Sequence, residues 1–290
     1  MEKIKIGIIG GSGLYEVDGA KVLEEIIIDT PWGSPSDSIT VAEIDGVKAA
    51  FLPRHGKGHV FTPSEIPYRA NIAAMKIIGV EEIYSFSAVG SLKEEIKPTH
   101  FVIPDQVIDR TKFRQHENSF FEKGVVGHVA FADPFCFRLH DIIKPALKEA
   151  GITYHTDETL ICMEGPAFST RAESRLYRTW GAGLINMSTL PEAKLAREAQ
   201  ICYAVICMST DYDSWKDDEE HVSVEMIIKY MNENSANGKK LIHALLKRAG
   251  KDERSCACPQ ASKYAIFTSK DKIPHEKASK IKSILPGHDI

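Results

Sequence analysis

Long hydrophobic runs are missing from this sequence of 290 residues, and so is an excess of charge of either sign. No stretch approaches the ~20 consecutive apolar residues that cross a bilayer, and the N-terminus, MEKIKIGIIGGSG, lacks the apolar run of a signal peptide. We therefore expect a cytoplasmic protein without a membrane segment. The 36 basic and 40 acidic residues are interspersed, so the chain presents no basic surface for a nucleic-acid backbone.

Cysteine is scarce, and its positions do not suggest the disulfide framework of a small secreted protein. Four of the six cysteines lie in apolar runs, where a thiol behaves as a small hydrophobe, and we expect them in the core: Cys136, Cys162, Cys202 and Cys207. Cys256 and Cys258 form a Cys-x-Cys pair that could be half a metal site or a strained redox pair. No second thiol pair or histidine cluster accompanies it in the sequence, so we expect no metal site, because structural zinc needs four ligands. A disulfide between the two stays open.

Repeats and low-complexity blocks are absent too, and strand-like and helix-like apolar periods alternate up to about residue 249. This pattern predicts an α/β fold with one domain over residues 1–250. Residues 251–290 are more polar and are expected to form a tail that packs on the same domain or on a neighbouring subunit. The predicted strands are Lys3 to Ile9, Ile39 to Ile44, Lys48 to Pro53, Glu82 to Ser87, Phe101 to Ile108, Glu158 to Met163, Gly183 to Asn186 and Gln200 to Ser209.

Helix starts are indicated at three places. Asp133-Pro134 places a capping residue before proline, and Thr170-x-x-Glu173 and Thr189-x-x-Glu192 have the spacing of capping boxes. The longest helical pattern runs from about His221 to Arg248, where Gly238 could break or kink it. In a sheet of this kind ligands gather beyond the carboxyl ends of the strands, so the loops there are the candidates for function.

The first such loop is Gly10-Gly11-Ser12-Gly13. Its glycine spacing is not that of a dinucleotide fingerprint, which disfavours NAD. Glycines allow backbone N–H groups to converge on an anion, and Ser12 adds a hydroxyl donor. An anion site and a plain tight turn both remain open at this point.

The second loop, Pro53 to His59, carries Arg54 and His55 on a glycine-rich backbone. Arginine can grip phosphate through two parallel hydrogen bonds, and the histidine can supply another. His55 and His59 have the i, i+4 spacing of a zinc pair, but Gly56 and Gly58 disfavour the helix that such a pair requires. A phosphate site is the stronger interpretation, with a solvated basic loop as the alternative.

Two further strand exits have small or acidic side chains. The segment from Ser85 to Ser91 combines small residues with hydroxyls, which leaves space for a ligand. In Ser209-Thr210-Asp211-Tyr212-Asp213, the two acids could hold a metal, face solvent, or act as proton donor and hydrogen-bond acceptor toward a base.

Seven motifs spread over nearly the whole chain carry a resemblance to a known family. They are GIIGGSGL (7–14), DTPWGSPSD (29–37), RHG (54–56), DPFC (133–136), MEGPAFSTRAES (163–174), WGAGLINMSTLPEA (180–193) and STDYDSW (209–215). In these motifs the chain resembles the 5'-methylthioadenosine phosphorylases of the trimeric purine nucleoside phosphorylase superfamily. The resemblance implies a single α/β domain with a central mixed β-sheet flanked by helices. It also implies an enzyme that splits 5'-methylthioadenosine with inorganic phosphate and needs no metal or organic cofactor.

The resemblance also assigns roles to individual residues. Phosphate would be bound by Ser12, Arg54, His55, Ser87, Ala88 and Ser188. The nucleoside would be bound by Phe168, Met187, Asp211, Tyr212 and Asp213, and Ser169, Val224 and Ile227 would set specificity. The assembly would be a homotrimer or a dimer of trimers, in which His128 and Ile284 reach into a neighbouring subunit's site.

The implied mechanism follows from the chemistry of the glycosidic bond. Phosphate attacks the anomeric carbon and offsets the positive charge that develops on the ribose. Asp211, if its enclosed setting raises its pKa, could donate a proton to purine N7, and it could accept from the 6-amino group of adenine. Two alternatives stay open: a phosphorylase for 6-oxopurine nucleosides or methylthioinosine, and a non-catalytic module that binds an adenine ligand.

Overall fold

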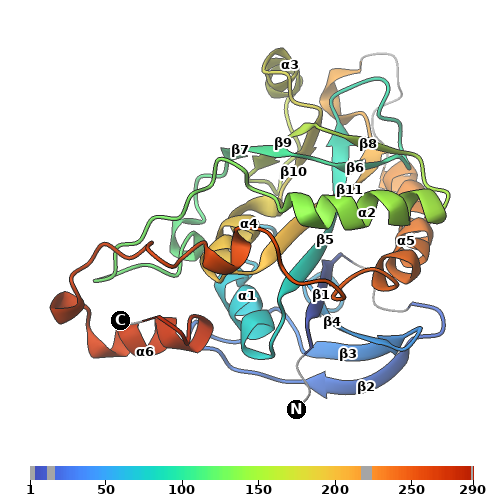
Figure 1. Ribbon diagram of the computed structural model, residues 1–290. Helices are drawn as coiled ribbons and strands as arrows, with labels where there is room; N and C mark the ends of the chain where they lie inside the picture. Colours follow the sequence, from blue (N-terminus) through green and yellow to red (C-terminus); the bar gives the residue numbers. More distant parts are fainter. Residues whose placement is uncertain (1–3, 12–16, 217–223, 289) are drawn as a thin grey trace.

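A mixed sheet of 11 strands forms the centre of the protein in a computed structural model that describes residues 4–11, 17–216, 224–288 and 290 (Figure 1). The strand order is β2-β3-β4-β1-β5-β10-β9-β7, while β11 pairs with β5 and β6, and β6 pairs with β8. The long strand β5 pairs in parallel with β1 and β11. The strands are β1 (Ile6–Gly10), β2 (Lys21–Ile26), β3 (Ile39–Ile44), β4 (Val47–Pro53), β5 (Glu82–Ser91), β6 (Phe101–Ile103), β7 (Gln106–Arg110), β8 (Tyr154–Thr156), β9 (Thr159–Met163), β10 (Leu184–Asn186) and β11 (Cys202–Asp211).

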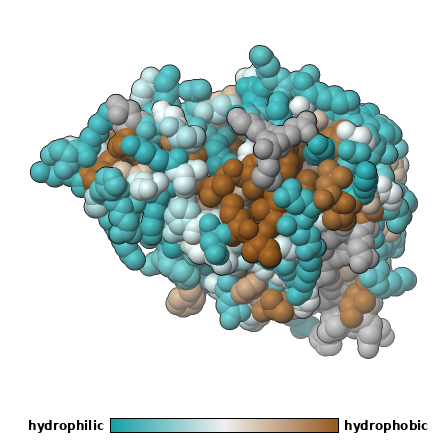
Figure 2. All heavy atoms as spheres, turned by 90° about the horizontal axis from the view of Figure 1, so that it is seen from below, coloured by the Kyte–Doolittle hydropathy of each residue, from teal (hydrophilic) through white to brown (hydrophobic). Residues whose placement is uncertain are grey.

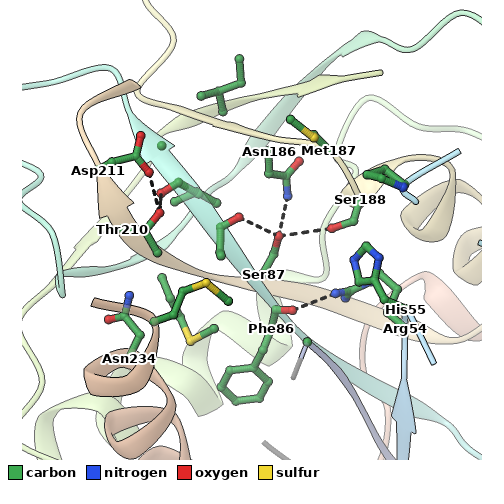
Figure 3. Close-up of a pocket in the computed structure, with 18 of the residues that line it drawn as sticks. Arg54, His55, Phe86, Ser87, Asn186, Met187, Ser188, Thr210, Asp211 and Asn234 are labelled. Carbon is green, nitrogen blue, oxygen red and sulfur yellow. Dashed lines mark hydrogen bonds between the residues drawn. The ribbon is translucent and has the colours of Figure 1, made fainter. Parts of the chain in front are cut away.

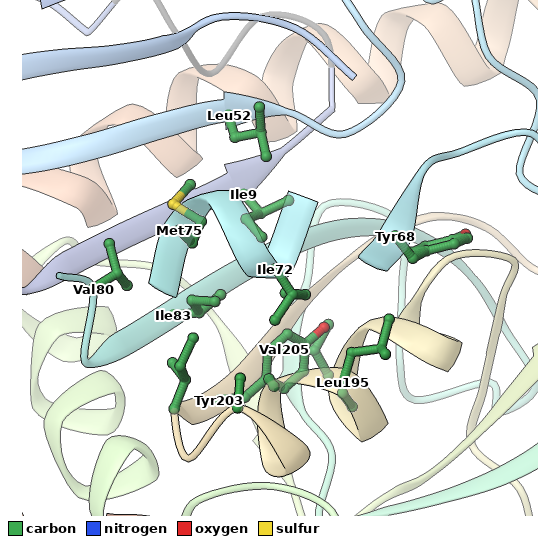
Figure 4. Close-up of a cluster of buried hydrophobic side chains, with 14 of the residues drawn as sticks. Ile9, Leu52, Tyr68, Ile72, Met75, Val80, Ile83, Leu195, Tyr203 and Val205 are labelled. Carbon is green, nitrogen blue, oxygen red and sulfur yellow. The ribbon is translucent and has the colours of Figure 1, made fainter. Parts of the chain in front are cut away.

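Helices cover both faces of this sheet, which explains why its central strands are apolar throughout. Strand β1 shows the principle: Ile9 belongs to the core cluster that contains side chains of α1 and α4 (Figure 4), whereas Ile6 and Ile8 belong to the cluster with α2 and α5. Within the described residues the helices are α1 (Tyr68–Ile77), α2 (Phe137–Glu149), α3 (Arg171–Thr179), α4 (Thr189–Glu198), α5 (Val224–Leu246) and α6 (His275–Ile284). None of them combines the length and the apolar character that crossing a membrane requires.

The α/β class and the sheet predicted from the sequence are confirmed, with three differences. Strand β2 was missed because all but its last residue are exposed, so no apolar alternation marks it. Strand β8, with the sequence YHT, was missed because none of its three residues is fully buried and no apolar run marks it. The predicted strand from Phe101 to Ile108 is two strands, β6 and β7, since Pro104 between them has no N–H to donate to a ladder.

The three predicted helix starts had different outcomes. Thr170 and Glu173 form the reciprocal capping box at α3. The other two predictions were wrong: α2 begins at Phe137 after Cys136, and α4 follows Ser188, whose side chain makes no cap bond. Helix α5 continues through Gly238, which neither ends nor breaks it.

The segment after α5 packs against the α/β domain of its own chain. Helix α6 packs against α1, and Ile281 and Leu285 are buried in the core cluster that contains α1 and α4 side chains. The surface seen in Figure 2 is mostly hydrophilic but carries a continuous apolar area near its middle.

Candidate active site

One cavity of about 290 Å³ lies where β1, β4, β5, β10 and β11 end, next to helix α5. This volume is near the lower end of the roughly 300–1,000 Å³ typical of small-molecule sites. Its position agrees with the rule that ligands bind beyond the carboxyl ends of strands. The lining residues that matter below are Arg54, His55, Ser87, Ala88, Phe168, Asn186, Met187, Ser188, Met208, Asp211 and Met231.

Arg54 follows β4 and lies at one end of the cavity, where it is 2% exposed (Figure 3). Its Nε donates to Glu192 Oε2 at 2.8 Å, and its Nη2 donates to Glu192 Oε1 at 3.1 Å. Nη2 also donates to Ser85 Oγ, and Nη1 donates to the Phe86 carbonyl at 3.0 Å. These four bonds leave one of the five guanidinium N–H groups without a partner among the described residues. Although burial opposes its charge, the Glu192 carboxylate raises the pKa of Arg54, which therefore stays cationic.

His55 stands beside Arg54, and its ring is held by the loop that follows. Nδ1 lies 2.9 Å from the Phe61 carbonyl. A carbonyl can only accept, so Nδ1 carries the hydrogen and the neutral ring keeps Nε2 as an acceptor. Burial, reinforced by the charge of Arg54, lowers the pKa of His55 to about 4. The loop closes tightly at Gly56, whose φ of 74° suits glycine.

Two serine hydroxyls complete this end of the cavity. Ser87 Oγ lies 3.3 Å from Ser188 Oγ and accepts a hydrogen bond from Asn186 Nδ2 at 2.9 Å (Figure 3). Ala88, the next residue of β5, also lines the cavity. Ser12 lies outside the described residues, but Gly11 before it reaches the same cavity. The structure thus brings together one cation, one imidazole and two hydroxyls at one end of the cavity, a set of groups suited to an anion.

Asp211 ends β11 and lines the opposite end of the cavity from Arg54 (Figure 3). Its Oδ1 accepts from the Thr210 hydroxyl at 2.6 Å, and its Oδ2 accepts from the Asp213 N–H at 2.9 Å. Both bonds fix the orientation of the carboxyl group. A Cβ added at Gly90 would lie 3.2 Å from Asp211 Oδ2, so glycine at this lining position leaves space for the acid.

The sequence-predicted nucleoside residues divide into two groups. Phe168 and Met187 line the cavity with Asp211, and Arg114 holds the Met187 loop by donating to its carbonyl at 2.6 Å. Tyr212 and Asp213 do not line it. Tyr212 packs its ring against Trp215 and donates its hydroxyl to the Glu94 carbonyl.

Asp213 is instead a buried neighbour of Asp211. Burial raises the pKa of its carboxyl group above the ordinary value, and Oδ2 has no hydrogen-bond partner in the described part of the chain. Ser169 also stays outside the lining: its hydroxyl lies 3.6 Å from Met163 Sδ, and its carbonyl accepts from Ser214.

Four predicted residues lie elsewhere or are only partly described. Val224 and Ile227 belong to the first turn of α5, and their side chains lie outside the description. His128 is exposed beside Phe267 at the surface. Ile284 does not fit the role expected of it, because its side chain is 0% exposed and packs in the core of its own chain.

Sequence reasoning missed several residues of this site. Glu192 was assigned to a helix cap, but it is fully buried and accepts from Arg54, Ser85 and Tyr203. Asn186 orients Ser87, and Met231 of α5 adds an apolar wall. No pattern in the sequence of α4 indicated this role of Glu192, because its partner Arg54 lies 138 residues away.

Comparisons with a family model and with known protein sequences all point to the same class of enzyme. Residues 5–247 match the Phosphorylase superfamily. The chain is 51% identical to the S-methyl-5'-thioadenosine phosphorylase of Geobacter sulfurreducens, over 99% of this chain and all of that relative. The corresponding enzyme of Synechocystis is 48% identical over 98% of this chain and 88% of that protein.

Solved structures agree. A methylthioadenosine phosphorylase from an antarctic soil metagenomic library is 43% identical, with a TM-score of 0.93 over 99% of this chain and 100% of that one. The enzyme of Schistosoma mansoni in complex with adenine is 33% identical, with a TM-score of 0.83 over 90% and 96% of the two chains. The fold and the match over residues 5–247 are those of the phosphorylase superfamily. Within that class, the chain belongs to the S-methyl-5'-thioadenosine phosphorylase family.

Proposed function

We propose that this protein catalyses the reversible phosphorolysis of 5'-methylthioadenosine to adenine and 5-methylthioribose 1-phosphate, a reaction of purine and methionine salvage. The observation that carries the proposal is that one cavity is lined by Arg54 at one end and Asp211 at the other. An anion and a base can therefore be held on opposite sides of one sugar. Family members such as the relative that is 51% identical over 99% of this chain support the same reaction.

At the anion end, the protein supplies a charge that is fixed before the substrates arrive. Glu192 and Ser85 hold Arg54 in one orientation, so little reorganisation is needed when phosphate binds. The free N–H of Arg54 and the hydroxyls of Ser87 and Ser188 donate to phosphate oxygens. Phosphate held in this way is oriented for attack on the anomeric carbon, and its negative charge stabilises the oxocarbenium-like transition state.

His55 contributes as a neutral ring. Its Nδ1–H is committed to Phe61, so Nε2 accepts the hydrogen of monohydrogen phosphate. This bond places the remaining, charged oxygens of the anion toward Arg54 and the sugar. Ser12, one residue beyond Gly11 of the lining, is proposed to add a further hydroxyl donor.

At the base end, Asp211 is proposed as the catalytic residue. Its protonated carboxyl group donates to purine N7 while its other oxygen accepts from the 6-amino group. General acid catalysis of this kind contributes roughly 10²–10⁴-fold. Asp213 holds the Asp211 carboxyl through its N–H, and we assign it a positioning role instead of direct contact. Phe168 covers the base and Met187 lies against the ribose.

The 5'-methylthio group is proposed to lie against the apolar side chains next to α5. Met208 and Met231 line this part of the cavity, and Val224 and Ile227 stay predictions for it. A hydroxyl buried there without a partner would cost about 1–3 kcal/mol, which favours methylthio over hydroxyl. Ser169, which lies behind the lining, is proposed to act on base choice only through the backbone of Phe168.

We also propose a homotrimer that works in the cytoplasm; stacking of two trimers stays a prediction. His128 lies in a surface where residues 126–128 pair with residues 265–268. The ring of Phe267, 71% exposed, packs against His128, and Tyr264 in the same segment is 82% exposed. Clustered apolar surface of this kind is typical of an interaction site, and the apolar area in Figure 2 supports association as well. A trimer would place His128 at a neighbour's cavity.

Phosphorolysis of 5'-methylthioadenosine, adenosine and inosine at matched concentration, with and without phosphate, tests the proposal. We expect adenine release only with phosphate, fastest from 5'-methylthioadenosine. Faster turnover of inosine would assign the protein to 6-oxopurine nucleosides instead. Tight binding without phosphate-dependent release would make it a binding module.

A further inference from the structure

Four of the six cysteines converge at one place, although the outermost two, Cys136 and Cys258, are 122 residues apart in the sequence. All four Sγ atoms lie within 4.8 Å of one another. Cys136, Cys202 and Cys258 are at most 5% exposed, and Cys256 is partly exposed. The thiol pair that the sequence seemed to lack is thus supplied by Cys136 and Cys202.

We propose that these four cysteines bind one structural zinc ion: Cys136, Cys202, Cys256 and Cys258. A tetrahedral ion with Zn–S bonds of about 2.3 Å holds its sulfur atoms about 3.8 Å apart. The Cys202 and Cys256 Sγ atoms lie at 3.4 Å, and no pair exceeds 4.8 Å, so small rotations of the side chains reach this geometry. Four thiolates in a tetrahedron select zinc among the common divalent ions.

The local backbone brings the ligands to one side. Cys136 is the N-cap residue of α2, and Cys202 begins β11. The N–H of Cys136 donates to the carbonyl of Tyr203 at 2.8 Å, which ties these two segments together. Cys258 begins a single 3₁₀ turn, so Cys256 and Cys258 can present their sulfur atoms to the same point.

Positive groups around the four cysteines would stabilise the negative charge of a zinc–thiolate centre. Binding of Zn²⁺ by four thiols releases four protons and leaves a net charge of −2. Arg138 Nη2 lies 3.7 Å from Cys202 Sγ and also pairs with Glu82, while Nε and Nη1 are buried without a hydrogen-bond partner among the described residues. The positive end of the α2 dipole lies at Cys136. Both features stabilise thiolates over thiols.

The proposed ion would have a structural role. Cys202 and Asp211 are the two ends of β11, so ten residues at ~3.3 Å each place the Cys202 thiol roughly 30 Å from the proposed catalytic carboxyl group. Two of the ligands belong to the segment after α5, whose Ile281 and Leu285 complete the core beside α1. Zinc would anchor this segment to β11 and α2.

The first test is the metal content of the full-length protein without an affinity tag, produced in zinc-supplemented medium and purified under reducing conditions without chelator. We expect about one zinc per chain, as a single four-ligand site requires. In the Cys256→Ala/Cys258→Ala variant, zinc should fall at least tenfold. The matched control is Cys162→Ala/Cys207→Ala, which removes two fully buried thiols outside the cluster and should keep its zinc.

Two measurements on the wild-type protein do not depend on any variant. Replacement by Co²⁺ should give the charge-transfer and d–d bands of tetrahedral cobalt thiolate, and removal of zinc should lower Tm while kcat/KM at low temperature is retained. In a second preparation that is purified without reductant and then denatured in chelator, all six thiols should be alkylated. Alkylation of only two would show two disulfides and overturn the proposal, as would iron in place of zinc or no metal uptake by the reduced protein.

Discussion

Arg54 and Glu192, which are 138 residues apart in the chain, form an ion pair in which both side chains are buried. The distance between Arg54 Nε and Glu192 Oε2 is 2.8 Å. This pair joins the loop after β4 to helix α4 and fixes the guanidinium that lines the cavity. The carboxylate also accepts from Ser85 and Tyr203, so its remaining lone pairs are used. Such a pair keeps a charge in place inside the protein at the expense of desolvation.

Glu192→Gln should therefore damage both stability and phosphate binding. Removing one charge of a buried pair leaves the other uncompensated, which lowers the free energy of unfolding by about 3–5 kcal/mol. A guanidinium no longer held on two sides should raise the KM for phosphate by about tenfold or more, equivalent to ~1.4 kcal/mol. Urea unfolding and phosphate kinetics measure the two effects.

The matched control is Glu198→Gln, at a buried glutamate of the same helix. Burial raises the pKa of Glu198 to about 7, so a neutral amide resembles its protonated form. This variant should keep the phosphate KM of the wild-type protein. Equal effects of the two substitutions would show that burial, and not the contact with Arg54, explains the role of Glu192.

Asp211→Asn should change the choice of base. An amide can donate to the 6-oxygen of a 6-oxopurine, whereas it has no acidic proton to transfer to N7. We expect kcat/KM for 5'-methylthioadenosine to fall by about 10²–10⁴-fold, the usual contribution of a general acid, and the ratio of inosine to adenosine turnover to rise. Asp141→Asn, on the exposed side of α2, is the control. An unchanged ratio would remove Asp211 from base recognition.

Met231→Gln should weaken the preference for the methylthio group. Met231 lines the cavity from α5, and a polar side chain there gives a 5'-hydroxyl a partner. The ratio of kcat/KM for 5'-methylthioadenosine over adenosine should fall by roughly 10–200-fold, in line with one apolar contact of about 1–3 kcal/mol. Ile228→Gln serves as control, because Ile228 lies on the same helix, is exposed and does not line the cavity. A ratio that stays constant in Met231→Gln would place the 5' group elsewhere.

Stability should fall in acid because two imidazoles are buried in the neutral form. The pKa of His140 is lowered to about 4 by burial and the nearby Lys144, and burial and Arg54 lower the pKa of His55 to about 4 as well. A lowered folded-state pKa stabilises the protein above pH 6.5, the unfolded value, and this contribution is lost as pH falls toward 4. Each group should account for about 3 kcal/mol between pH 7.5 and pH 4.

Urea unfolding at a series of pH values measures this loss. His140→Gln should flatten the acid limb of the stability curve, whereas His116→Gln, at an exposed position, should leave it unchanged. Because His140 belongs to α2 and lies outside the cavity lining, the phosphate kinetics should not follow this substitution. An acid limb that is equally steep in His140→Gln would contradict the assignment.

The sequence predicted the parts of the fold that depend on local patterns. Apolar runs such as residues 202–208 identify buried strands, and the strand-exit loops with Arg54 and Asp211 identify the ends of the cavity. The exposed strand β2 and the three-residue strand β8 carry no such pattern. The elements that the sequence predicts are therefore those that are buried on both faces, because such strands consist almost entirely of apolar residues.

Long-range partners could not be predicted in this way. The spacing of Thr189 and Glu192 fits a capping box, but burial beside Arg54 determines the role of Glu192. Tyr212 and Asp213 follow Asp211 in the chain, yet the turn after β11 directs them away from the cavity lining. The convergence of the four thiols likewise depends on where α2, β11 and the C-terminal segment meet.

The most direct test of the account follows phosphorus during the reaction by ³¹P NMR, with the wild-type protein, 5'-methylthioadenosine and inorganic phosphate. One cavity that holds phosphate at Arg54 and adenine at Asp211 predicts a new sugar 1-phosphate resonance that grows in step with released adenine. Adenine release while the inorganic phosphate resonance stays constant would show hydrolysis by water and would contradict the account.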